Sequence, residues 1–266
     1  MTADHDPMTR ALAGLTVPAP DRLRPHVLAD VGLADLYARI DSPIGPLTVA
    51  WNELGVSLVD AEPDDARFEA RHLAVTGRAA YPETSLPPRL AELIARRMSG
   101  DRRAKIRLDL RGHSPFEQDV WRKALEIPRG EVRPYGWVAA EIGRPRAVRA
   151  VGTALGHNPV PLIVPCHRVV RTDGTIGQYS LGGPENKRTI LSAEGLDPEA
   201  MEAAARRGER YVGSATTHIV CWPTCRTGVR MLAHNRRSFP SLRDAAAAGY
   251  RPCKVCRPDS GATLAA

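Results

Sequence analysis

The placement of cysteine is the feature that most constrains how this chain can fold. Four of the five cysteines form two short pairs: Cys221 with Cys225, and Cys253 with Cys256. Four thiolates in two closely spaced pairs are a common donor set of a tetrahedral zinc site. In a segment this short and polar, the metal would supply much of the folding free energy. The pattern therefore predicts a small zinc-stabilised C-terminal domain at residues 210–260, with a linker at 198–209 before it and a tail at 261–266.

The charge of the chain is concentrated around these cysteines. The 266 residues carry a formal net charge of +7. Residues 206–259 hold eleven Lys or Arg and three acidic residues. Such a basic segment suits a polyanionic partner. The sequence has no apolar run long enough for a membrane span and no signal-peptide pattern, so we expect a cytoplasmic, nucleoid-associated protein with no membrane contact.

Residues 35–112 have the pattern of a small α/β subdomain. Short β-type runs bounded by Gly, Pro or Asn turns predict strands. These strands are expected at residues 36–40, 46–51, 56–59 and 106–110. Helical periodicity predicts helices at 64–75 and 88–98. Without a cysteine or a catalytic cluster, this unit is interpreted as a scaffold, and the Pro-, Asp- and Ala-rich residues 1–34 as an N-terminal extension.

From residue 113 the pattern becomes helical, and a second subdomain is expected at 113–197. Apolar residues recur at helical spacing after Ser114, a favourable N-cap. Two short Ala-rich stretches follow, at 135–143 and 147–155, and the Gly/Pro turn between them is typical of a helix-turn-helix. Arg149 lies in the first turn of the second helix, which is the one that would enter a nucleic-acid groove.

The end of this subdomain is expected to contain a hairpin and a helix. Val169–Ile176 has the pattern of a hairpin whose turn is Asp173-Gly174. A Gly-rich loop then leads into a helix at 185–194, which Gly195 closes.

The fifth cysteine, Cys166, lies alone in the stretch IVPCHRVV, residues 163–170. The ordinary alternative is a buried cysteine that fills a core as a small apolar group. Its neighbours His167 and Arg168 argue against this, because a positive environment lowers the pKa of a thiol. We expect an extended segment in which His167 acts on the thiol through water or a turn rather than directly. A thiol hydrolase would also need an acyl-binding site, which the sequence does not show.

The residues 165–169, PCHRV, together with Asn158-Pro159, resemble the O6-alkylguanine-DNA alkyltransferases, also called methylated-DNA–protein-cysteine methyltransferases. Further matches follow the order and spacing of that family: Ser42–Thr48, Phe116–Trp121, Ile127–Gly130, Tyr135-Gly136, Arg149–Gly152 and Ile190–Gly195. Many short matches in register are specific, and they span about residues 36–196. The resemblance implies a ribonuclease H-like α/β N-terminal subdomain and a mostly helical catalytic subdomain with a helix-turn-helix.

The resemblance also implies a single-turnover DNA repair reaction. Cys166 would accept the alkyl group of O6-methylguanine, and of O4-methylthymine, after the base is flipped out of the duplex. It implies His167 as a base acting through water, Glu194 as the group that orients it, and Tyr135 as the proton donor to the departing guanine. The implied DNA- and base-binding residues are Arg149, which fills the gap in the stack, Asn158, Val160, Pro161, Val169 and Ser180.

The C-terminal region resembles the metal-binding domain of the Ada adaptive-response protein, on residues 211–225 and 246–259. This implies Zn²⁺ as the metal and Cys221 as a second candidate acceptor, for methyl groups from DNA phosphotriesters. A structural zinc module that docks on DNA is the equal alternative.

The alternative for the whole chain is a non-catalytic sensor of alkylated DNA or a transcriptional regulator. Cys166 argues against a non-catalytic sensor, because alkyltransferase-like binders lack the acceptor thiol. We expect a monomer whose partner is double-stranded DNA containing alkylated guanine.

Overall fold

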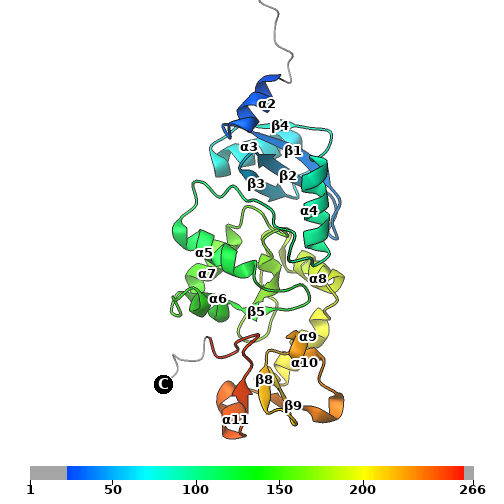
Figure 1. The fold of residues 1–266 in the computed structure, drawn as a ribbon, viewed down its shortest axis with the longest axis vertical. Coiled ribbons are helices and arrows are strands. Elements are labelled where there is room, and N and C mark those ends of the chain that lie inside the picture. The colour runs from blue at the N-terminus through cyan, green and yellow to red at the C-terminus, as the bar shows by residue number, and fades with distance from the viewer. Residues whose placement is uncertain (1–22, 261–266) are drawn as a thin grey trace, which may run out of the picture.

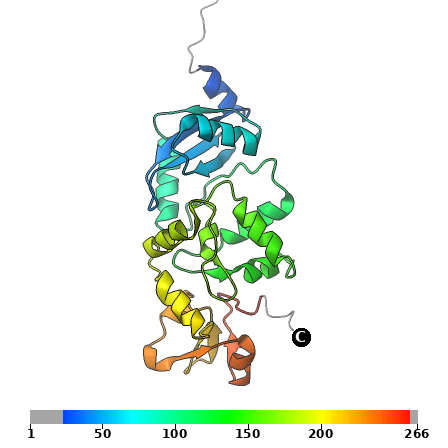
Figure 2. The same ribbon diagram turned by 180° about the vertical axis from the view of Figure 1, so that it is seen from behind.

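The computed structural model describes residues 23–260, which form three parts stacked along one axis (Figure 1). An α/β part lies at one end, a mostly helical part in the middle, and a small part with its own sheet at the other end; Figure 2 shows the same order from behind. The predicted tail at 261–266 and residues 1–22 of the predicted extension lie outside the described residues. Within residues 23–260, no helix has the length and apolar character needed to cross a bilayer.

The α/β part is built on a four-stranded sheet. Its elements are α2 (Leu23–Asp30), β1 (Asp35–Ile40), β2 (Leu47–Asn52), β3 (Gly55–Asp60), α3 (Asp65–Thr76), β4 (Ala80–Pro82) and α4 (Pro88–Met98). The strand order is β3-β2-β1-β4, with β1 to β3 antiparallel and β4 parallel to β1. Successive side chains of a strand point to opposite faces, so Phe68 of α3 packs on one face of the sheet and Ile94 of α4 belongs to the core on the other.

The predicted fourth strand at 106–110 forms only an isolated bridge, between Leu108 and Val56 of β3. The backbone of Val56 donates to Arg107 O at 2.9 Å and accepts from Asp109 N at 2.9 Å. Gly55 permits this close approach, because a Cβ there would lie 2.3 Å from Arg107 O. The segment therefore extends past the sheet toward the helical part instead of continuing as a paired strand.

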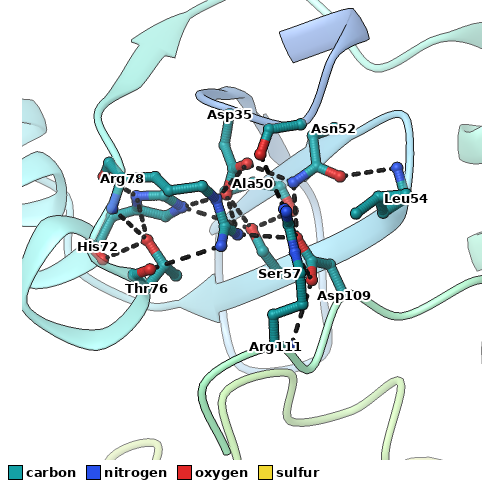
Figure 3. Close-up of polar contacts among 11 residues, drawn as sticks. Asp35, Ala50, Asn52, Leu54, Ser57, His72, Thr76, Arg78, Asp109 and Arg111 are labelled. Atoms are coloured by element: carbon teal, nitrogen blue, oxygen red, sulfur yellow. Dashed lines mark hydrogen bonds and ion pairs between the residues drawn. The ribbon is translucent and has the colours of Figure 1, made fainter. Parts of the chain in front are cut away.

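A buried polar network fills one end of this sheet (Figure 3). Asp35 accepts bonds from Ser57 at 2.6 Å and Asn52 at 2.5 Å and faces His72 Nε2 at 2.6 Å. Arg78 bridges Asp35 and Asp109, at 3.1 and 2.9 Å. Burial alone would raise the pKa of Asp35, but the hydrogen bonds, led by those of His72 and Arg78, outweigh it and lower that pKa. The ionised carboxylate is thus part of the fold.

The helical part carries the predicted helix-turn-helix. Its elements are α5 (Pro115–Ala124), β5 (Arg133-Pro134), α6 (Tyr135–Glu141), α7 (Val148–Gly156), the 3₁₀ turn η1 (Cys166–Arg168), β6 (Val169-Val170) and α8 (Gly183–Ala193). Ser114 caps α5 through a reciprocal capping box with Glu117. The buried Trp121 of α5 donates from Nε1 to Ala154 O of α7 at 2.7 Å, which fixes the two helices together.

Two segments in or next to this part differ in secondary structure from what the sequence suggests. The predicted hairpin at 169–176 is a strand, β6, followed by a tight turn, since Arg171 N donates to Thr175 O at 2.9 Å. The strand pairs in parallel with β5, Arg133 with Val169 and Pro134 with Val170, and residues 171–176 form no return strand. The predicted linker at 198–209 contains a helix, α9 (Pro198–Arg206), which Asp197 caps by accepting from Ala200 N at 2.9 Å.

The C-terminal part has a four-stranded sheet of order β10-β8-β7-β9. Its elements are β7 (Tyr211–Ser214), β8 (Ile219–Cys221), α10 (Arg226–Val229), η2 (Ala233–Asn235), β9 (Arg236–Phe239), α11 (Leu242–Ala247) and β10 (Arg251-Pro252). The core of this part consists of Val212 and the four cysteines, with few other apolar side chains. A core this small needs additional stabilisation.

Candidate active site and metal centre

A tight turn between α7 and η1 holds the lone thiol. The Asn158 amide donates to Cys166 Sγ at 3.1 Å and to Val164 O at 3.1 Å, and its Oδ1 accepts from Val160 N at 3.1 Å. Leu162 in the turn adopts φ 69°, a left-handed conformation that is unusual for a residue other than glycine. Three bonds from one side chain therefore fix the backbone on both sides of this turn.

Cys166 begins the 3₁₀ turn η1, so the expected extended segment is corrected. Its amide donates to Val164 O at 2.8 Å, and Arg168 N donates to Pro165 O at 2.9 Å. Proline at 165 cannot donate a ladder hydrogen bond, which disfavours a strand here. Cys166 is 5% exposed, and burial raises the pKa of its thiol, an effect that the Asn158 hydrogen bond only partly offsets.

His167 and Arg168 both bind Glu194, which follows α8. His167 Nε2 lies 3.0 Å from Glu194 Oε1, and Arg168 Nη2 lies 2.6 Å from the same oxygen. Burial alone would raise the pKa of Glu194, but the bonds from His167 and Arg168 hold it at about 2. Burial lowers the pKa of His167 more than Glu194 raises it, so the imidazole is neutral near pH 7.

The tautomer of His167 follows from this pairing. An ionised carboxylate only accepts hydrogen bonds, so Nε2 must carry the proton. Nδ1 then has a free lone pair, and it is buried without a hydrogen-bond partner among residues 23–260. A neutral imidazole with an unpaired ring nitrogen next to a thiol can take up a proton.

Three further side chains surround the thiol. Lys187 of α8 is fully buried and donates to Val169 O at 2.7 Å, and burial lowers its pKa to about 8. Its ammonium lies 6.0 Å from the ring centroid of Tyr135, which starts α6. Burial also raises the pKa of Tyr135, so this phenol stays protonated and is able to donate. Tyr179 packs edge-on against His167, with ring centroids 6.2 Å apart.

The structure brings only some of the predicted residues to the thiol. Val160 lies in the Asn158 turn, and Val169 is held by Lys187. Pro161 is buried in the same turn and forms a bridge with Val164. Ser180 and Arg149 are instead exposed, the first in the loop before α8 and the second in the first turn of α7.

Lys187 is not among the expected site residues, although the sequence contains a signal for it. Lys187, Ile190 and Leu191 have the i, i+3, i+4 spacing of one helix face, and all three are buried. A lysine on the apolar face of a helix has to find a buried partner, and here the partner is a carbonyl beside the reactive turn.

The four C-terminal cysteines form one compact cluster. Their sulfur atoms all lie within 4.8 Å of one another, and all four residues are buried. Sulfurs of a tetrahedral zinc site with Zn–S bonds of about 2.3 Å are roughly 3.8 Å apart, so this spacing fits zinc. The pairs come from separate elements, Cys221 and Cys225 from the end of β8 and the start of α10, and Cys253 and Cys256 from the turn after β10.

Two family profiles match the chain. The DNA-binding domain of 6-O-methylguanine DNA methyltransferase matches residues 115–196, and the metal-binding domain of Ada matches residues 200–259. The second match and the cysteine cluster confirm the predicted zinc site. Together, the profiles define an alkyltransferase fused to an Ada-type metal-binding domain.

Known relatives are similar to more than half of the chain. The methylated-DNA–protein-cysteine methyltransferase of Mycobacterium tuberculosis is 40% identical over 163 residues, 59% of this chain and 91% of the relative. The bifunctional transcriptional activator/DNA repair enzyme Ada of Escherichia coli is 37% identical over 63% of this chain and 47% of that protein. A crystal structure of the M. tuberculosis OGT with DNA is 34% identical, with a TM-score of 0.49, and covers 63% of this chain and 99% of that one. By its sequence relatives, the chain belongs to the methylated-DNA–protein-cysteine methyltransferase family.

Proposed function

We propose that this protein repairs DNA by transferring the methyl group of O6-methylguanine, and of O4-methylthymine, to Cys166 in a single turnover. The observation that carries the proposal is the buried Cys166 thiol next to a neutral His167 whose Nδ1 is unpaired, in a chain of this family. A hydrolase would regenerate its thiol, whereas a thioether has no obvious route back.

The transfer is a displacement at the methyl carbon. The Cys166 proton passes to His167 Nδ1 through water, and the sulfur attacks the methyl carbon as its bond to O6 breaks. The electron pair of that bond goes to the guanine, which takes a proton from Tyr135. The products are S-methylcysteine and guanine. Burial raises the pKa of Cys166, so the thiol is protonated at rest and needs this base.

The remaining roles concern DNA. A base inside the duplex cannot reach a buried thiol, so it must be flipped out at a cost of a few kcal/mol. We assign the filling of the vacated stack to Arg149, which is exposed on α7. Asn158 braces the turn, Val160, Pro161 and Val169 line the pocket, and Ser180 contacts the base from its exposed loop.

Zinc would be held by all four C-terminal cysteines, and it would keep their sulfurs as thiolates. In one role the zinc domain docks on DNA through its basic residues, and in the other Cys221 accepts methyl groups from phosphotriesters. The complete burial of Cys221 favours the docking role.

The finer organisation is part of the same proposal. We assign a ribonuclease H-like subdomain to 35–112, a catalytic subdomain to 113–197 and a zinc domain to 210–260, with α9 connecting the last two. The protein acts as a monomer on double-stranded DNA. A four-stranded sheet with helices on both faces supports the first assignment.

One experiment tests the reaction. The full-length protein is incubated with duplex DNA containing O6-methylguanine, and intact and peptide masses are measured. We expect one added methyl group on the Cys166 peptide, none in Cys166→Ala, and no second turnover. If DNA is bound but neither protein is modified, the chain is a sensor of alkylated DNA and not a transferase. A methylphosphotriester substrate and the Cys221 peptide test the second acceptor in the same way.

A further inference from the structure

The zinc domain is packed against the catalytic subdomain, on the side where β5 lies (Figure 1). The connection is a helix and not a free linker. Glu202 of α9 accepts from Ile176 N at 3.1 Å and from Arg188 at 2.9 Å. The turn after β6 and α9 pack so closely that a Cβ on Gly174 would lie 2.5 Å from the Cβ of Ala205. The two parts are therefore held in a defined relative position.

The first cysteine pair contacts the residues just before β5. Thr224, one residue before the ligand Cys225, is 6% exposed, and its hydroxyl accepts from Val132 N at 2.9 Å. Arg226 N, on the other side of Cys225, donates to Glu131 Oε1 at 3.2 Å. Glu131 is buried and paired with Arg133 of β5. Backbone and side-chain bonds thus join this metal-binding loop to the segment at 131–133.

The second cysteine pair contacts α6 in the same way. Arg257, next to the ligand Cys256, pairs with Glu141 at 2.5 Å, and its guanidinium lies 6.0 Å from the Trp137 ring centroid. Glu141 also accepts from Ser260 at 2.5 Å. Both metal-binding loops therefore hold the segment 131–141, one at its start and one at its end.

This segment leads directly to the acceptor site. Val132 is three residues before Tyr135, the assigned proton donor. Strand β5 pairs with β6 through Arg133 and Val169, and Val169 is three residues after Cys166. The zinc-binding loops thus contact the residues around β5. Tyr135 follows the end of β5, and Cys166 precedes the start of β6, the strand with which β5 pairs.

We propose that Thr224 and Glu141 are positioning residues for the transfer to Cys166, through which the metal-loaded cysteine cluster holds β5 and α6 in register with the acceptor turn. The inference rests on the proposed function. When the four cysteines hold their metal, both loops are rigid and the segment 131–141 is fixed. When they do not, Val132 loses its bond to Thr224, and the distance between Tyr135 and Cys166 varies.

The test compares Thr224→Val with Thr227→Val, a matched control on an exposed position of α10. Thr224→Ser is the rescue variant, because it keeps the hydroxyl. Full-length proteins with equal zinc content are assayed for the single-turnover rate of methyl transfer to Cys166 at saturating DNA. Hydrogen exchange of the Val132 amide is measured on the same samples. We expect Thr224→Val alone to transfer roughly threefold to tenfold more slowly, the range for losing one ordinary hydrogen bond, and to exchange Val132 faster.

Zinc removal distinguishes positioning from a local loss of packing. Chelation should slow transfer in the wild type. Its effect should be smaller in Thr224→Val, because the hydrogen bond between residue 224 and Val132 is already lost there. If chelation and the substitution acted independently, their effects on the transfer rate would instead multiply. If Thr224→Val binds less zinc, Glu141→Gln replaces it, because Glu141 contacts the zinc domain through Arg257 and Ser260, neither of which is a metal ligand.

Failure of the positioning role and failure of the proposed function give different results. A wild type that transfers normally, with Thr224→Val unchanged in both rate and Val132 exchange, overturns the positioning role. A wild type that never methylates Cys166 overturns the proposed function instead, and the exchange of Val132 still reports whether the zinc domain holds β5.

Discussion

At the scale of single residues, Glu194 is kept in its ionised form by its two neighbours, His167 and Arg168. Its pKa is held at about 2 against an ordinary value of 4.5, because His167 and Arg168 bond to its ionised form. A carboxyl with a lowered pKa contributes stability that is complete above pH 4.5 and is lost as the pH falls from 4.5 to about 2. The shift corresponds to roughly 3 kcal/mol. We expect the free energy of unfolding of the wild type to fall steeply over this range.

Urea unfolding of wild type and Glu194→Gln between pH 5 and pH 3 measures this contribution. The glutamine does not titrate, so its unfolding free energy should change less with pH. Every other carboxyl, and the acid-sensitive zinc site, is common to both proteins and cancels in the difference. Parallel curves for the two proteins would show that His167 and Arg168 do not lower the pKa of Glu194.

Asn158 is the second residue whose removal has a defined cost. Its three hydrogen bonds hold Val160, Val164 and the Cys166 sulfur. Asn158→Ala leaves a buried carbonyl and amide unpaired, which costs about 1–3 kcal/mol for each such group. We expect lower stability in urea and, in the protein that stays folded, slower methylation of Cys166. A variant destabilised to this extent with an unchanged transfer rate would mean that the turn does not position the thiol.

The sequence is informative about residues with a local signature and silent about the rest. Cys166 was predicted from its immediate neighbours. The pairing of Arg168 with Glu194 could not be predicted from the sequence, because the two residues are 26 positions apart and either could have faced solvent. The backbone at His167 forms a 3₁₀ turn and not an extended segment. This conformation depends on Pro165 and on the Asn158 turn, whose shape is set by contacts across the site.

At the scale of elements, helix α7 presents Arg149 away from the protein. A side chain that replaces a flipped base acts on the duplex and not on the displacement itself. We expect Arg149→Ala to slow transfer from saturating duplex DNA by roughly tenfold or more, since flipping the target out of the stack costs a few kcal/mol and an arginine that fills the gap would offset part of that cost. Reaction with the free O6-methylguanine base should be unchanged. Arg122→Ala, an exposed arginine on α5, is the matched control, and an equal loss in both variants would reduce Arg149 to a phosphate contact.

The polar network around β1 makes a different prediction. Asp35 is fully buried between His72, Arg78 and Ser57 (Figure 3), far along the chain from Cys166. Removing one partner of a buried ion pair typically costs 3–5 kcal/mol, so Asp35→Ala should lose about that much stability in urea. Asp65→Ala, whose carboxylate pairs with Arg39 on the surface, should lose about 1 kcal/mol or less. Folded Asp35→Ala should methylate Cys166 normally, and a slowed transfer would assign this network a role in the reaction.

Elements with a clear period were predictable, and elements that depend on partners were not. The periodic helices at 64–75, 88–98 and 147–155 lie within a few residues of α3, α4 and α7. The missed helix α9 follows Asp197, a good N-cap, and begins at Pro198, a favourable first-turn residue, but its Ala-rich body carries only one large apolar side chain, Met201. The predicted strand 106–110 has the right alternation and pairs at one position only.

For the whole molecule, the sequence indicates separate modules but not how they meet. Thr224 and Val132 are 92 residues apart, and neither belongs to a motif that predicts a contact. The zinc cysteines could be grouped from spacing alone, because metal ligands follow a local rule. A packed interface follows shape and hydrogen bonding over the whole fold, which spacing does not encode.

Counting reactive thiols in the native protein tests the division of labour among the five cysteines. The proposed metal site takes up four of them and leaves Cys166, so a disulfide reagent should find one thiol, reacting slowly because Cys166 is 5% exposed. After chelation of zinc, the count should rise to five, since the released thiols gain access to solvent as the small core loosens. Prior incubation with O6-methylguanine DNA should lower each count by one. Five thiols without chelation would rule out the metal site, and unchanged counts after repair would rule out Cys166 as the acceptor.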